Sequence, residues 1–292
     1  MSVEKTQQIQ PSTGAIIGGV LAGSTVNGLV KLPVKRAAGS VMKNMQKISG
    51  GLNSDEFKIV RQAIEDTIKN TGLDKKGVSI LKATSENSDQ IAEALKYEFN
   101  NNILTKRLPK AIKEFLVYLQ GSQCSRAENA FYTFKAKKLL LPEKLSLAGF
   151  HEIGHAANQN LSKAAKMLQK CRPLMLLATP IALIALLKTQ KPQEPESTTG
   201  KVTTFIKENA GKLTFAAFLP TLAEEALATF KGNGYARKLL NPELASKAAK
   251  TNALGFVSYA LLALGASLGI YLGVKLKDAI TDNSIKKRAD KL

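Results

Sequence analysis

The order of apolar and polar positions predicts helices along most of the chain. Asn53 and Ser54 are good helix N-caps, and apolar residues then recur at helical spacing over 57–68. Gly72 is placed to end this helix, since glycine adopts the left-handed conformation that closes many helices. The stretch from Ser54 to Gly72 is therefore predicted to be an amphipathic helix with a clear start and end.

The next hundred residues predict a mixture of helices and short strands. The β-rich stretch 77–84 predicts a strand, and helices are expected from about Ser88 and over 108–120. Between 129 and 142 apolar residues alternate with lysines, which predicts one strand with a wet face. After it the chain is expected to be helical without interruption over 143–171.

Four further segments are apolar enough to enter a membrane or a core. The Gly-rich stretch 14–30 is either a membrane anchor or a buried helix of small residues. The uncharged stretch 174–187 is short for a span, and it either crosses with help from its flanks or forms half of a hairpin kinked at Pro180. A polar loop is expected over 188–201, followed by a helix over 213–230.

The longest uncharged run, 253–274, is long enough to cross a bilayer and precedes a lysine-rich tail, so it predicts a transmembrane helix. The fold class expected is mainly α, with a small β-sheet (α+β) and membrane-embedded helices. Five segments are expected: an N-terminal segment (1–50), a core (51–172), an apolar segment with a loop (173–212), a helix with acidic residues (213–245) and a C-terminal transmembrane helix with its tail (246–292).

Charge identifies the kind of partner. The 292 residues include 42 Lys+Arg and 23 Asp+Glu, which gives a net charge of +19. This excess favours an anionic partner. Because the lysines are spread along the chain and no nucleic-acid-binding motif is present, we expect a membrane with anionic lipids and no nucleic acid. Cys124 and Cys171 do not form a disulfide framework.

Both histidines of the chain lie in one motif, His151-Glu152-Ile153-Gly154-His155, which has the form HExxH. On a helix, residues four apart share a face, so His151 and His155 can offer two imidazoles to one metal ion. Glu152 then lies beside the metal, where it serves as a base toward water rather than as a ligand. A helix that carries two histidines only for packing is the alternative.

A catalytic zinc ion needs a third protein ligand. The chain has no third histidine, which excludes the metzincin motif HExxHxxGxxH, and Cys171 lies in a basic stretch that makes it a poor candidate. The remaining candidates are Glu224 and Glu225, an acidic pair within an apolar helix. Such a pair is costly to bury unless something binds it. The alternative is a solvated helix face.

These motifs give the chain a resemblance to a known family. The HEIGHA core, the later Glu-x-x-Ala-Thr at 225–229 and the apolar segments between them are similar to membrane-associated gluzincin metallopeptidases of the HtpX-like and CAAX-endopeptidase-like kinds. The resemblance implies that Zn²⁺ is held by His151, His155 and Glu225 and that Ala228 packs against the HExxH helix. Thr229 stands where the family has Asp or Ser.

The resemblance has further implications for the site. Glu224 is the alternative ligand, or it takes over the orienting role of the missing Asp. The segment 129–142 is similar to the edge strand along which a peptide substrate of that family lies as an added strand. Tyr235 and Arg237 follow the Glu helix and are candidate donors to the oxyanion, on position alone.

Taken together, these features predict a membrane-associated zinc endopeptidase that acts on a peptide or protein substrate, with Glu152 as the general base. The many lysines and arginines over 31–172 predict that its catalytic face is cytoplasmic. The alternative is a non-catalytic membrane scaffold or lipid-binding protein with a structural or degenerate metal site.

Overall fold

The computed structural model describes residues 10–102, 105–188 and 197–291 and divides the chain into two compact units. Unit 1 comprises Met1–Arg36, Leu174–Leu219 and Leu261–Leu292, and unit 2 comprises Ala37–Pro173 and Pro220–Ala260. Most of the loop predicted over 188–201 lies outside the described residues.

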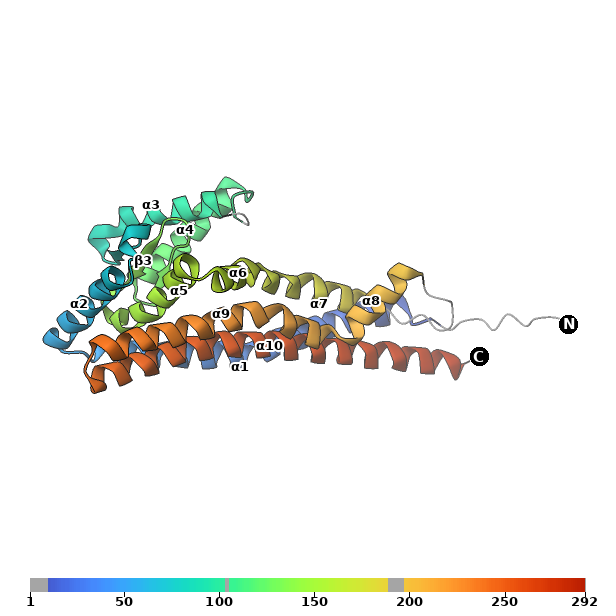
Figure 1. The fold of residues 1–292 in the computed structure, drawn as a ribbon. Helices are drawn as coiled ribbons and strands as arrows, with labels where there is room; N and C mark the ends of the chain where they lie inside the picture. Colours follow the sequence, from blue (N-terminus) through green and yellow to red (C-terminus); the bar gives the residue numbers. More distant parts are fainter. Residues whose placement is uncertain (1–9, 103–104, 189–196, 292) are drawn as a thin grey trace. The chain divides into compact units, whose positions relative to one another are not determined.

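The structure is mainly helical with one small sheet, as predicted (Figure 1). The helices are α1 (Thr13–Gly50), α2 (Ser54–Asn70), α3 (Ser88–Asn101), α4 (Lys110–Ser125), α5 (Gly149–Leu161), α6 (Lys163–Cys171), α7 (Ala178–Leu187), α8 (Thr198–Glu208), α9 (Ala210–Leu239) and α10 (Pro242–Ala289). The strands are β1 (Ser79–Lys82), β2 (Phe131–Tyr132) and β3 (Lys138–Leu141). Short 3₁₀ helices cover Asp74–Lys76, Ser85–Asn87, Glu143–Ala148 and Arg172–Leu177.

The capping prediction for α2 is confirmed. The Asn53 side chain accepts the backbone N–H groups of Asp55 and Glu56 at 3.0 and 2.9 Å. In return the Glu56 carboxylate accepts the Asn53 N–H at 2.9 Å, which completes a capping box. Gly72 follows the helix with a φ of 70°, in the left-handed region that glycine adopts without strain.

The sheet has the strand order β1-β3-β2, with β1 parallel and β2 antiparallel to β3. The single strand predicted over 129–142 is wrong, because a turn over 133–137 divides it into the hairpin β2-β3. The Glu98 carboxylate of α3 accepts the N–H of Lys135 in this turn at 2.5 Å, a long-range contact that alternation along the chain does not reveal. The hairpin leaves β2 as an edge strand.

The helix predicted over 143–171 is also interrupted. Ser162 has φ −138° and ψ 116°, so α5 ends there, and its hydroxyl accepts the N–H of Ala165 at 3.3 Å to begin α6. Serine favours such a cap over a helix interior. Pro180 lies in the first turn of α7, where its missing N–H costs no helical hydrogen bond.

Four helical stretches are long and apolar enough to cross a membrane: Thr13–Gly50, Lys163–Leu187, Ala210–Leu239 and Pro242–Ala289. Their length and composition are consistent with the predicted membrane association, whereas the cytoplasmic side stays a prediction. The run 253–274 lies within α10. In unit 1, a Cβ added to Gly23 of α1 would lie 2.5 Å from the carbonyl oxygen of Gly273 in α10, so the two helices touch through small residues.

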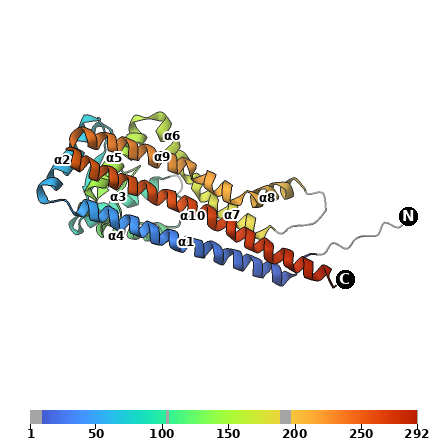
Figure 2. The same ribbon diagram turned by 90° about the horizontal axis from the view of Figure 1, so that it is seen from below.

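In unit 2, α5 and α9 cross with their backbones in contact (Figure 1, Figure 2). A Cβ on Gly154 would overlap the carbonyl oxygen of Ala228, and one on Gly232 would overlap that of Phe150. The implied packing of Ala228 against the HExxH helix is therefore present. The crossing is surrounded by the main hydrophobic core of unit 2, which also includes Ile153.

We expect Gly154→Ala to lower the free energy of unfolding by about 1–3 kcal/mol, because the added methyl group meets backbone atoms that cannot rotate away. Denaturation of the detergent-solubilised protein measures this. The matched control is Gly234→Ala in α9, where an added Cβ meets nothing within 4 Å and the substitution should be neutral or stabilising. Equal stability of the two variants would contradict a close crossing.

Candidate metal centre

The HExxH motif begins in the first turn of α5, and all three of its functional side chains are buried. Because His151 and His155 are one helical turn apart, their rings meet with nearly perpendicular planes, and the two Nε2 atoms lie 3.1 Å apart. Two imidazole nitrogens this close together can supply two of the ligand atoms that a metal ion needs.

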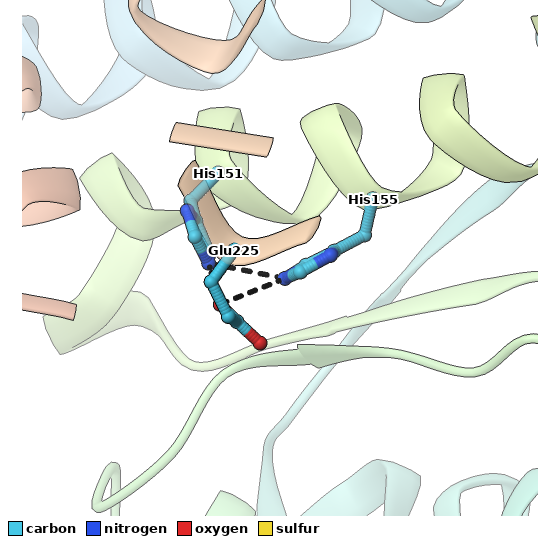
Figure 3. Close-up of side chains that lie close together, drawn as sticks. All are labelled: His151, His155 and Glu225. Carbon is cyan, nitrogen blue, oxygen red and sulfur yellow. Dashed lines mark hydrogen bonds and ion pairs between the residues drawn. The ribbon is translucent and has the colours of Figure 1, made fainter. Parts of the chain in front are cut away.

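Glu225 of α9 completes the group (Figure 3). Its Oε2 lies 3.0 Å from Nε2 of His151 and 3.4 Å from Nε2 of His155. Zinc–ligand bonds of about 2.0–2.1 Å place the ligand atoms of a tetrahedral site about 3.3–3.4 Å apart. Among the described residues, these three are the group of His, Cys, Asp and Glu side chains close enough to hold a metal ion.

The other nitrogen of each ring is also engaged. Nδ1 of His155 lies 2.9 Å from Oε1 of Glu224, and Nδ1 of His151 lies 3.2 Å from the hydroxyl of Thr229. A hydrogen on each Nδ1 leaves the Nε2 lone pairs free for a metal, which is the usual arrangement of metal-binding histidines. The sequence left two candidates for the third ligand. Glu225 lies beside the Nε2 atoms of both histidines, whereas Glu224 contacts Nδ1 of His155 and orients that ring.

Glu224 has more partners than the sequence suggested. Its Oε1 accepts from Asn158 at 2.9 Å and Gln169 at 2.8 Å, and its Oε2 accepts from Arg172 at 2.6 Å. Arg172 also contacts Oε1 of Glu225 at 2.7 Å. These three residues were missed. Asn158 was detectable, since it lies three residues after His155 on the same helical face.

Burial and charge shift the proton affinities of α5. Burial lowers the pKa of His155, but the charges of Glu225 and Glu224 outweigh burial and raise that pKa to about 10. Burial raises the pKa of Glu152, against the opposing effect of the two histidines. Without a cation His155 therefore holds a proton at neutral pH, which a bound metal ion has to displace. The pKa of Glu152 is thus shifted upward, toward the range in which a general base works best.

The site opens onto a cavity of about 540 Å³ within unit 2. Its lining includes Glu152 and both histidines, together with the edge strand β2. Oε2 of Glu152 accepts the backbone N–H of Tyr132 in that strand at 2.7 Å, which fixes the carboxylate at the wall. The proposed base and the two candidate histidine ligands thus line one cavity together with an edge strand.

Tyr235 and Arg237 are not brought to this cavity. Because α9 continues to Leu239, Arg237 lies about 18 Å along the helix axis from Glu225. Arg237 is exposed, and Tyr235 packs against the hydrophobic core instead. Tyr259 of α10 lines the cavity, as Tyr132 of β2 does, and the Arg172 guanidinium lies 5.7 Å from the Tyr259 ring centre. No sequence signal marked it.

Comparisons with known proteins place the chain in no family. No protein-family model, no curated protein and no solved structure matches it. The resemblance to gluzincin metallopeptidases therefore rests on the sequence motif and stays a prediction, and the donor set of two imidazole nitrogens and one carboxylate oxygen fits a zinc ion on its own chemistry.

We expect the purified, detergent-solubilised protein to bind about one zinc ion per chain after reconstitution. His155→Ala and Glu225→Gln should each abolish stoichiometric binding, because each removes one of three ligand atoms. Metal analysis after gel filtration measures the content, with Glu93→Gln on the exposed face of α3 as the control. Zinc that persists in Glu225→Gln would place the third ligand elsewhere.

Glu224→Gln and Thr229→Val should weaken zinc binding by about 10–100-fold without abolishing it, because they remove groups that orient the rings and no ligand. Competition against a chromophoric chelator measures the affinities. If Glu224→Gln removed zinc as completely as Glu225→Gln does, the assignment of roles to the two glutamates would be reversed.

Proposed function

We propose that this protein is a membrane-associated zinc endopeptidase. One observation carries the proposal: three buried donor atoms of α5 and α9 lie 3.0–3.4 Å apart, and the two histidines among them line a cavity that Glu152 also lines. Both rings are held through Nδ1, so the donors are oriented before a metal binds. A site built only for packing needs neither the shared cavity nor a carboxylate beside it.

The proposed chemistry assigns Glu152 the movement of protons. A zinc ion bound by His151, His155 and Glu225 would lower the pKa of a coordinated water to about 7 and polarise a carbonyl group. Glu152 takes a proton from the attacking water on its carboxylate and passes it to the leaving amine nitrogen. The raised pKa of Glu152 supports this role, because a stronger base accepts the first proton more readily.

A peptide is the substrate class that the cavity supports best. β2 lines the cavity as an edge strand, and a peptide that adds to it would displace the contact between the Tyr132 N–H and the Glu152 carboxylate. The volume of about 540 Å³ lies within the range of ligand pockets, about 300–1,000 Å³. Tyr259 lines the cavity, as Arg172 does, and is the better placed donor to a developing oxyanion, so it replaces Tyr235 and Arg237 in this role.

A second candidate is a membrane scaffold whose metal site is structural or degenerate. The observation that favours it is Arg172, which contacts both Glu224 and Glu225. With His155 protonated, two cationic and two anionic side chains balance in the metal-free site, so burial of the glutamates has an explanation without catalysis.

Glu152→Gln tests the proposed activity. We expect it to retain zinc and to lower the rate of cleavage of an internally quenched peptide library by at least about 100-fold, because glutamine cannot accept the proton. Glu143→Gln, an exposed carboxylate just before α5, is the control and should cleave as the wild type does.

The same pair of variants separates the two candidate functions. If the wild type binds zinc stoichiometrically but cleaves no peptide of the library faster than the background without enzyme, the scaffold is favoured. If the wild type cleaves above that background and Glu152→Gln cleaves at the same rate, Glu152 is not the base.

A further inference from the structure

One face of α4 is apolar and exposed to solvent. Ile112, Phe115, Tyr118 and Leu119 have exposed fractions of 46%, 60%, 73% and 37%. At about 100° per residue, these four side chains fall within an arc of about 120° that contains no charged residue. A contiguous apolar arc of this size is unusual for a helix that faces only water.

The apolar face of α4 is not used in packing the α3-α4 hairpin. The opposite side of α4 already buries Val117 and Cys124 in a cluster with Ile91 and Leu95 of α3. The α3-α4 hairpin is therefore held by one side of α4, and the exposed side is available for a partner.

Basic residues accompany the apolar face. Lys106 and Arg107 precede α4, and Lys110 begins it, and all three are exposed. Lys113 lies on the other side of α4, where its ammonium group donates to the Asn100 side chain of α3 at 2.9 Å. Glu114, the acidic residue of this helix, lies 3.8 Å from the ammonium group of Lys110, so the end of the hairpin stays strongly positive. Lysine and arginine beside exposed aromatic and aliphatic side chains are typical of helices that lie in a membrane interface.

We propose that the apolar face of α4 docks on the surface of an anionic bilayer. Phe115 and Tyr118 enter the interfacial region, and the basic residues at the start of the helix contact lipid phosphates. The occupant is a membrane rather than a second protein because of this charge complementarity and because a membrane-associated chain is always close to lipid. The inference is independent of catalysis and of the metal.

The test uses the full chain in vesicles of phosphatidylcholine with and without phosphatidylglycerol. A single cysteine at Phe115→Cys or Tyr118→Cys, in a Cys124→Ala, Cys171→Ser background, carries an environment-sensitive fluorophore. We expect nitroxide groups on the acyl chains to quench this label in the anionic vesicles. The matched control, Lys58→Cys on the exposed face of α2, should be quenched by iodide in the water instead.

Charge reversal tests the electrostatic part. Because each basic residue near an anionic surface contributes a factor of about five to binding, Lys106→Glu combined with Arg107→Glu should shift the docking equilibrium by more than tenfold and restore iodide access at 115. An unchanged thermal unfolding transition of the variant verifies its fold.

Three results would overturn the proposal. Iodide quenching at 115 equal to that at the control site would show that the face stays in water. Protection from both quenchers would show that a protein, such as a second copy of the chain, covers it. Lipid quenching that is the same without phosphatidylglycerol and after charge reversal would show that anionic lipid is not what holds it.

Discussion

The contact between the backbones of α5 and α9 is the constraint on which the rest of unit 2 depends. Packed helices ordinarily lie about 8–10 Å apart, with side chains between them. Gly154 and Gly232 have no Cβ, and Ala228 has only one carbon, so this spacing is reduced at the crossing. A glutamate on α9 can then reach two histidine rings on α5. The two glycines therefore allow the helices to approach closely enough for the three candidate ligand atoms to lie together.

The close crossing also buries two carboxylates, and the surrounding side chains compensate their charge. Glu224 and Glu225 are buried, and buried carboxylates are strongly unfavourable without partners. Arg172 contacts both, and Asn158 and Gln169 donate to Glu224. The remaining negative charge faces the imidazoles, where either a proton or a metal ion can balance it. Metal uptake by such a site is an exchange of protons for a cation.

Local patterns in the sequence were sufficient for the features that local physics decides. The N-cap at Asn53, the pairing of the two histidines and the apolar span in α10 follow from spacing along one helix. The prediction of a single strand over 129–142 failed because Glu98, more than thirty residues away in the sequence, holds the hairpin turn. Arg172 and Tyr259 were missed for the same reason: their contacts depend on how separate helices pack.

X-ray absorption spectroscopy at the zinc edge of the reconstituted protein tests the central claim most directly, because it reports the ligand atoms themselves. The geometry of α5 and α9 predicts nitrogen and oxygen neighbours at about 2.0–2.1 Å, with the outer-shell scattering of two imidazole rings. A sulfur neighbour at about 2.3 Å, or a shell of oxygen alone without imidazole scattering, would contradict a centre formed by His151, His155 and Glu225.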